Sequence, residues 1–220
     1  MTERDPNSTQ GRIVMRDANW IRAMAMLAAA MLVSVAGVRA ESADEHMPAA
    51  PRAREPAVTS TSVQYVVPDV TLVRQDGKSV SLPHEMNDGR PVVLNFIFTT
   101  CGSICPLMSQ VLGQFQRKLG AESQHVHLMS ISIDPEEDTP PRLREYASQF
   151  GAGPGWNHYT GTLTASQQAQ RAFDVYRGDK MSHTPVTLLR AAPGQPWLRL
   201  DGFVTPDQLL MHYRHLTGAR

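Results

Sequence analysis

The sequence predicts an α/β sandwich in which a central mixed sheet is flanked by helices and accompanied by an N-terminal β-hairpin. The continuous β-rich run at 92–98 is typical of a strand that is buried on both faces, and 126–133 is expected to be a second buried strand. Segments with the spacing of amphipathic helices follow these runs. Because strands that alternate with helices pack as layers joined by crossovers, this pattern predicts a layered fold.

The first expected elements are the two short strands of the hairpin. The segments 70–74 and 79–82 alternate apolar and polar residues on either side of Asp76-Gly77. An Asp-Gly pair between two such runs is a strong signal for a tight turn between antiparallel strands. The run 92–98 then provides the first buried strand of the sheet.

The middle of the domain is expected to contain two helices separated by a strand. Apolar residues recur at helical spacing over 107–119, and the second buried strand, 126–133, ends at Asp134-Pro135. Pro140-Pro141 opens the next helix, because the first turn of a helix tolerates proline, and Gly151 ends it.

The C-terminal part is expected to add a short helix, a strand pair and a closing helix. The ranges are 163–173 for the short helix, 186–189 and 197–204 for the strands, and 206–216 for the last helix. Together with the earlier elements they complete the predicted sandwich.

Residues 1–40 have the pattern of a secretory signal peptide or an N-terminal membrane anchor. Arginines precede an apolar run over 23–36, and Val38 and Ala40 place short side chains before the expected cleavage site. A helix that spans a bilayer needs about 20 apolar residues, and this run is shorter. Its length therefore favours a cleaved signal peptide over a membrane anchor. We therefore expect the folded domain outside the cytoplasm.

A flexible linker and one folded domain are expected to follow. Residues 41–61 are rich in proline and alanine without an apolar period, as in a tether, and 62–220 has the size of one domain. The chain carries 21 basic and 21 acidic residues, a formal net charge of zero. No basic excess indicates nucleic-acid binding.

The two cysteines of the chain, Cys101 and Cys105, lie at the predicted junction of a strand and a helix. Free backbone amides and the dipole at a helix N-terminus favour thiolates there. The pair could act as a redox dithiol, hold a metal or form a structural disulfide, which export permits. A disulfide that closes so short a loop removes little chain entropy, so a purely structural role is disfavoured.

The spacing of the cysteines keeps metal binding open. Three residues separate Cys101 from Cys105, one more than in the usual thioredoxin motif. Two thiolates favour Cu(I) and are too few for a structural zinc site, so a third ligand must come from elsewhere.

The best candidate for that ligand is His183, in the loop before the predicted strand 186–189. Two cysteines and one histidine suit copper in either oxidation state. By position alone, however, an ordinary surface or core histidine is the better interpretation of His183. Asp134 could orient a ligand, tune a thiol or simply close the turn with Pro135, and His127 is expected to face solvent.

Three segments together resemble the SCO/SenC family of copper-binding, thioredoxin-fold proteins. They are Phe98 to Pro106, Ser132 to Pro140, and His183-Thr184. The resemblance covers about Val70 to the C-terminus and implies a thioredoxin-like sandwich. It also implies that Cys101, Cys105 and His183 are the copper ligands.

The resemblance implies an exported copper metallochaperone in the periplasm, or one anchored to the inner membrane and facing the periplasm. Its expected partners are an upstream copper donor protein and cytochrome c oxidase subunit II, whose binuclear copper centre it would load, or another cuproprotein. The alternative function is that of a thiol–disulfide oxidoreductase that reduces the partner's cysteines with Cys101 and Cys105 as the redox pair. Ser182, where family members commonly have aspartate, and Pro185 keep this alternative open.

Overall fold

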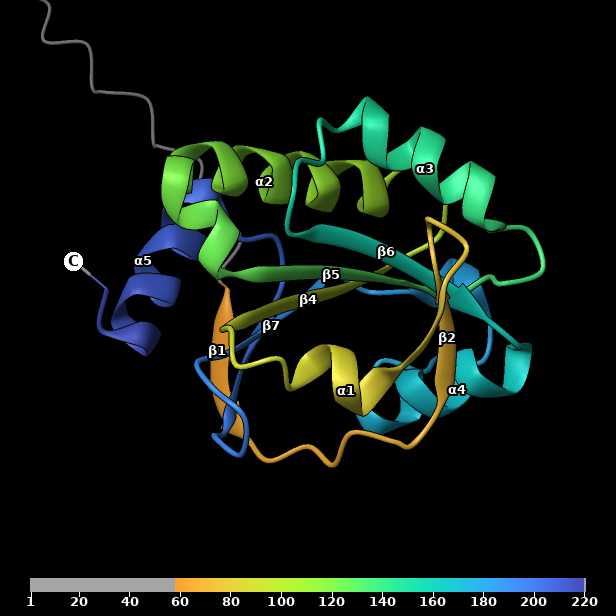
Figure 1. Ribbon diagram of the computed structural model, residues 1–220, viewed down its shortest axis with the longest axis horizontal. Helices are drawn as coiled ribbons and strands as arrows, with labels where there is room; N and C mark the ends of the chain where they lie inside the picture. Colours follow the sequence, from red (N-terminus) through yellow and green to blue (C-terminus); the bar gives the residue numbers. More distant parts are fainter. Residues whose placement is uncertain (1–57, 220) are drawn as a thin grey trace, which may run out of the picture. The chain divides into compact units, whose positions relative to one another are not determined.

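The structure, a computed structural model, describes residues 58–219 and places a mixed sheet between two layers of helices (Figure 1). The signal peptide or anchor expected at 1–40 lies outside the described residues, as does most of the linker expected at 41–61. Within 58–219, no helix is long and apolar enough to cross a membrane.

Eight strands form one sheet in the order β1-β8-β7-β4-β5-β6-β2-β3. Their bounds are β1 (Thr59–Val63), β2 (Thr71–Arg74), β3 (Ser79–Ser81), β4 (Val92–Ile97), β5 (His127–Ser132), β6 (Trp156–Gly161), β7 (Val186–Arg190) and β8 (Trp197–Asp201). The neighbours β4, β5 and β6 run parallel, and all other pairs are antiparallel. The predicted mixed sheet and the β2–β3 hairpin are therefore confirmed.

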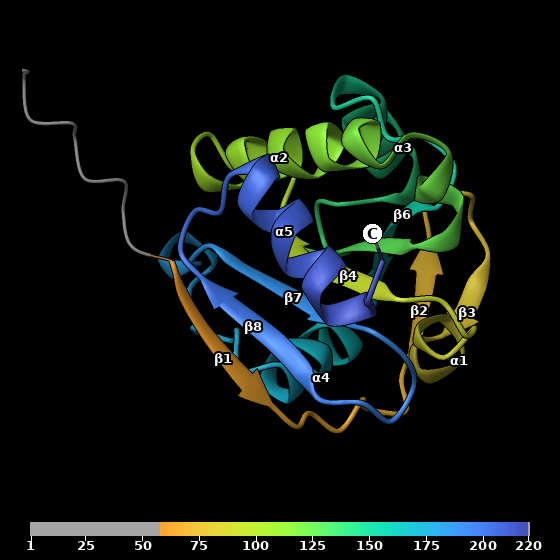
Figure 2. The ribbon, with the colours of Figure 1, turned by 90° about the vertical axis from the view of Figure 1, so that its left-hand side faces the viewer.

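The helices cover both faces of this sheet. They are α1 (Leu82–Met86), α2 (Ile104–Leu119), α3 (Pro140–Gln149), α4 (Leu163–Ala172) and α5 (Pro206–Thr217), with short 3₁₀ turns η1 (Gly120–His125) and η2 (Lys180–Ser182). Figure 1 shows α2 and α3 on one side of the sheet and α1 and α4 on the other. Figure 2 shows α5 beside α2, on the same side of β7.

The central strands are buried on both faces, as their apolar composition predicts. Every residue of β4 and β5 is buried. One hydrophobic cluster includes Phe96 and Phe173, and the other packs α2 against α5 through Phe115 and Tyr213, whose ring centroids lie 5.5 Å apart. The carboxyl ends of β4 and β5 lie side by side, with Ile97 paired to Ser132. Both loops that follow these strands therefore start at the same edge of the sheet.

Several elements differ from the sequence-based expectation. β1 already begins at Thr59, before the expected domain start at 62, and pairs with β8 along its full length. β6 was not predicted, because polar residues interrupt its apolar pattern although most of them are buried. α2 begins at Ile104 rather than at 107, and this places Cys105 inside the helix.

The expectation that His127 faces solvent was wrong. Its side chain is buried at the start of β5, with 1% of the residue exposed. The ring contacts the hydroxyl of Tyr159 through Nε2 at 2.9 Å and the backbone carbonyl of Glu85 through Nδ1 at 3.1 Å. These partners satisfy both ring nitrogens, so an apolar environment can accommodate the imidazole.

Candidate metal centre

Cys101 and Cys105 lie on the loop after β4 and in the first turn of α2. Ser103, the N-cap residue of α2, makes no side-chain capping hydrogen bond. The Cys101 Sγ atom instead accepts a hydrogen bond from the backbone N–H of Cys105, with an N–S distance of 3.5 Å. Cys101 thus satisfies one of the amides that a helix N-terminus leaves free.

The two thiols differ in environment. Partial burial alone would raise the pKa of the Cys101 thiol, but hydrogen bonds from the backbones of Cys105 and Ser103 outweigh it and lower the pKa. Burial raises the pKa of Cys105, which is completely inaccessible to solvent. Both cysteines are free thiols. Cys101 is therefore the more reactive thiol, because its pKa is lowered and it is partly exposed, whereas Cys105 is buried.

His183 follows η2 and is held by the strand that leads to the cysteines. Its Nε2 atom lies 3.0 Å from the carbonyl oxygen of Phe96 in β4. Because a carbonyl only accepts, Nε2 carries the proton, and Nδ1 of the neutral ring keeps a lone pair. Burial lowers the pKa of His183, so the ring is neutral at neutral pH. A histidine whose N–H is fixed in this way is prepared to bind a metal through its other nitrogen.

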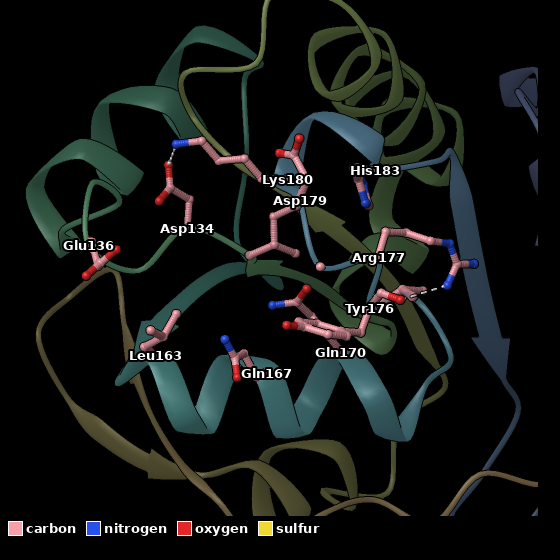
Figure 3. Close-up of a pocket in the computed structure, with 13 residues that line it drawn as sticks. Asp134, Glu136, Leu163, Gln167, Gln170, Tyr176, Arg177, Asp179, Lys180 and His183 are labelled. Atoms are coloured by element: carbon pink, nitrogen blue, oxygen red, sulfur yellow. Dashed lines mark hydrogen bonds and ion pairs between the residues drawn. The ribbon is translucent and has the colours of Figure 1, made fainter.

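His183 also lines a pocket of about 260 Å³ beside the loop after β5 (Figure 3). Asp134 and Lys180 pair there across 2.6 Å. The hydrogen bond from Lys180 to this carboxylate raises the pKa of the lysine. Lys180 is in turn joined to His183, whose backbone N–H donates to the Lys180 carbonyl at 3.1 Å. Asp134 therefore contacts the loop that carries His183.

Asp134 also closes the turn that follows β5, as one interpretation of the sequence expected. Its carbonyl oxygen accepts from the backbone N–H groups of Glu137 at 3.2 Å and Asp138 at 2.9 Å. The two roles considered for Asp134, in the turn and near a candidate ligand, are compatible because different atoms perform them.

The structure brings the two cysteines together but does not assemble the full ligand set. Within residues 58–219, no group of three His, Cys, Asp or Glu side chains is arranged to hold a metal ion. Cys101 and Cys105 approach each other at the start of α2, whereas His183 is bound to the Phe96 carbonyl. The ligand set of Cys101, Cys105 and His183 thus stays a prediction.

Sequence reasoning included Asp138 only as part of the segment Ser132 to Pro140 and gave it no role of its own, although it is a buried carboxylate close to the cysteine loop. Its side chain accepts hydrogen bonds from both the backbone N–H and the hydroxyl of Thr99, two residues before Cys101. In sequence, Asp138 lies in a turn just before a helix, where aspartate is common at the surface. Only its burial in the fold reveals a different role.

Comparison with known protein families gives a match over nearly all of the described residues. A family model described as SCO1/SenC matches residues 58–218. The SCO1 protein homolog of Bacillus subtilis strain 168 is 39% identical over 100 residues, which is 45% of this chain and 51% of that protein. The match thus spans about half the length of this curated relative.

Solved structures share the fold. ScoI of Arabidopsis thaliana with copper bound has a TM-score of 0.57 at 27% identity, and the match covers 68% of this chain and 96% of that one. BsSco, described as a member of the Sco family of cytochrome c oxidase assembly proteins with a disulfide switch, has a TM-score of 0.60 at 26% identity. That match covers 73% of this chain and 98% of BsSco.

Proposed function

The chain belongs to the SCO1/SenC family, and on this premise we propose that it is a copper metallochaperone that binds copper through Cys101, Cys105 and His183. The observation that carries the proposal is the pair of free thiols at the start of α2, with Cys101 Sγ 3.5 Å from the Cys105 amide. Two sulfurs and one imidazole nitrogen suit copper in either oxidation state. ScoI of Arabidopsis thaliana, which shares the fold, is described with copper bound, and this supports copper as the metal.

The proposed chemistry uses the different states of the two thiols. Cys101, with its lowered pKa, offers a thiolate as the first ligand. Cys105 must lose its proton as the copper arrives, because a thiol binds copper as the thiolate. His183 would contribute Nδ1, because its Nε2 is held by the Phe96 carbonyl. Copper affinity should therefore weaken as the pH falls.

The proposed cargo destination is a cuproprotein outside the cytoplasm. The resemblance of the sequence favours the binuclear copper centre of cytochrome c oxidase subunit II, and the description of BsSco as an oxidase assembly protein agrees. The signal-like segment at 1–40 supports export to the periplasm, with or without a membrane anchor. An upstream donor protein would supply the copper.

Titration of the reduced protein with Cu(I), in competition with a chromophoric chelator, tests the proposal. The parent protein should bind about one copper per chain. Replacing both cysteines with serine should abolish binding, and His183→Ala should weaken it about tenfold or more. The exposed His215 in α5 provides the control, because His215→Ala should bind copper like the parent. Retention of copper by the double serine variant would refute the proposal.

A second candidate function, thiol–disulfide exchange, is favoured by the asymmetry of the two thiols. The Cys101 thiolate would attack a partner disulfide, form a mixed disulfide and release one partner thiolate. Cys105 would then lose its proton and attack Cys101 Sγ, releasing the second partner thiol. The partner gains two electrons, and Cys101–Cys105 becomes the disulfide.

His183→Ala separates the two functions. If exchange is the main activity, this variant should lose copper affinity but keep the rate at which it reduces a model disulfide peptide. If the reduced parent shows no thiol of lowered pKa in a pH series of iodoacetamide alkylation, the exchange function is excluded.

A further inference from the structure

Asp138 is a fully buried carboxylate that connects the cysteine loop to the end of β5. Its residue exposure is 0%. The Thr99 backbone N–H lies 3.1 Å from Oδ1 and 3.2 Å from Oδ2, and the Thr99 hydroxyl donates to Oδ1 at 2.5 Å. The hydroxyl of Ser132 donates to Oδ2 at 2.6 Å. One carboxylate therefore joins the segment that follows β4 to the last residue of β5.

The main chain around Asp138 is fixed independently of its side chain. The backbone N–H of Asp138 donates to the Asp134 carbonyl at 2.9 Å, and the N–H of Asp134 donates to the Ser132 hydroxyl at 3.0 Å. The Ser132 hydroxyl is thus both an acceptor from this turn and a donor to Asp138. These hydrogen bonds hold the turn that carries Asp138, so the direction of its carboxylate toward Thr99 is fixed by the backbone.

The position of this carboxylate is unfavourable for stability alone. Burial raises the pKa of Asp138, and no ion pair within residues 58–219 includes it. A buried acid is tolerated when several donors satisfy it, yet an apolar side chain of similar volume often stabilises such a site more. An apolar residue could not accept the hydrogen bonds that the Asp138 carboxylate accepts from the backbone N–H and the hydroxyl of Thr99.

Thr99 transmits this constraint to the metal centre. It is two residues before Cys101, and the backbone N–H of Cys101 donates to the Phe98 carbonyl at 3.2 Å. A shift of Thr99 therefore moves the short turn that sets the Cys101 sulfur over the amide of Cys105. Metal sites lose affinity when such supporting hydrogen bonds are removed, although the ligands themselves remain.

We infer that Asp138 is a positioning residue that fixes Thr99 and thereby holds Cys101 in place for copper. The predicted effect on copper affinity rests on the proposed copper function. The structural link between Asp138 and Thr99, in contrast, can be tested without copper. The side-chain hydrogen bonds of Asp138 go to Thr99 and Ser132 and not to either thiol, so its contact with the cysteine loop runs through Thr99. Its charge also contributes, after burial, to the raised pKa of Cys105.

The test compares Asp138→Asn with Tyr159→Phe. Tyr159→Phe also removes a hydrogen bond to a carboxylate, that of Glu85, but at the opposite end of β5. Asp138→Asn should speed hydrogen exchange of the Thr99 amide and weaken Cu(I) affinity, each by about tenfold. Tyr159→Phe should leave Cu(I) affinity within about twofold of the parent, even where both variants lose similar thermal stability.

Thr99 offers a second pair of variants in case Asp138→Asn does not fold. Thr99→Ser keeps both donors, whereas Thr99→Val keeps only the backbone N–H. The inference predicts that Thr99→Val binds Cu(I) more weakly than Thr99→Ser by about threefold or more. Equal affinities of these two variants, or an Asp138→Asn protein with the Cu(I) affinity of the parent, would overturn the inference.

A parent protein that binds no copper would refute the proposed function but not the positioning role. The rate of iodoacetamide alkylation of Cys101 then decides. A change of about threefold or more in Asp138→Asn, with Tyr159→Phe like the parent, supports positioning. Equal rates in all three proteins overturn it.

Discussion

The two ends of the parallel strands β4 and β5 both carry polar clusters, but these clusters are built differently. At the amino end, His127 contacts the Tyr159 hydroxyl at 2.9 Å and Asp88 at 3.3 Å, and Tyr159 donates to Glu85 at 2.7 Å. At the carboxyl end, Cys101 is a free, partly exposed thiol. The amino end bonds its polar groups to one another, whereas the carboxyl end combines the bonded Asp138 carboxylate with a thiol that stays available.

The difference separates stability from function within one sheet. Polar groups that find fixed partners in the interior hold the strands in register at little net cost. The carboxyl ends of strands in open α/β sheets are where ligands bind, because the loops there can vary without disturbing the core. Changes at the amino end should therefore affect unfolding but not copper binding. Changes at the carboxyl end should affect copper binding, and unfolding as well where they break the hydrogen bonds of Asp138.

The largest expected effect on stability concerns His158, which lies in β6 between the two ends. Burial lowers its pKa to about 3. Because this value is below the ordinary 6.5, the unfolded chain takes up the proton first, and stability is lost as the pH falls from 6.5 toward 3. The stability contributed by a neutral His158 should fall by about 3 kcal/mol between pH 7 and pH 4.

His158→Phe isolates this contribution, because phenylalanine keeps the ring beside Trp156 but cannot titrate. Urea unfolding at both pH values should show that the variant loses less stability on acidification than the parent. Parallel pH dependence in the two proteins would show that His158 does not stay neutral in the fold.

An intermediate effect is expected at the amino end. Tyr159→Phe removes the hydroxyl that His127 and Glu85 share, and should lower the free energy of unfolding by about 1.5 kcal/mol. The comparison of the two ends requires that Cu(I) affinity stay within about twofold of the parent. Weaker copper binding without a loss of stability would contradict the separation.

The smallest effect on stability is expected at the carboxyl end. In Cys101→Ser the hydroxyl can still accept from the Cys105 amide, so the free energy of unfolding of the reduced protein should change by less than about 0.5 kcal/mol. Copper binding should nevertheless fall by about a hundredfold or more, since a soft ligand is lost. Thermal melts and chelator competition on the same samples measure both quantities, and a large loss of stability would break the contrast.

The sequence predicted those parts of the fold whose patterns are local. The apolar runs of β4 and β5, the Asp76-Gly77 turn and the helical spacing of α2 each depend on neighbours in the chain. β6 could not be found in this way, because buried polar residues such as His158 interrupt its pattern.

The sequence predicted those residues of the candidate site whose side chains have a characteristic chemistry, such as the two thiols. Cys101 and Cys105 were evident from their spacing. The expectation that the helix start favours thiolates is confirmed in direction for Cys101 but wrong for Cys105, whose pKa is raised by burial that the sequence does not reveal. His183 depended on a family resemblance, since nothing local distinguishes it. Asp138 remained hidden because its donors, Thr99 and Ser132, lie on other segments.

We propose that Cys101, Cys105 and His183 together bind one copper ion. X-ray absorption at the copper edge of the reduced, Cu(I)-loaded protein tests it most directly, with His183→Ala measured in parallel. Copper in the parent should have two sulfur neighbours and one nitrogen neighbour, and the nitrogen should be missing from the variant. A parent spectrum without sulfur, or identical spectra for the two proteins, would show that these three residues do not bind the copper together.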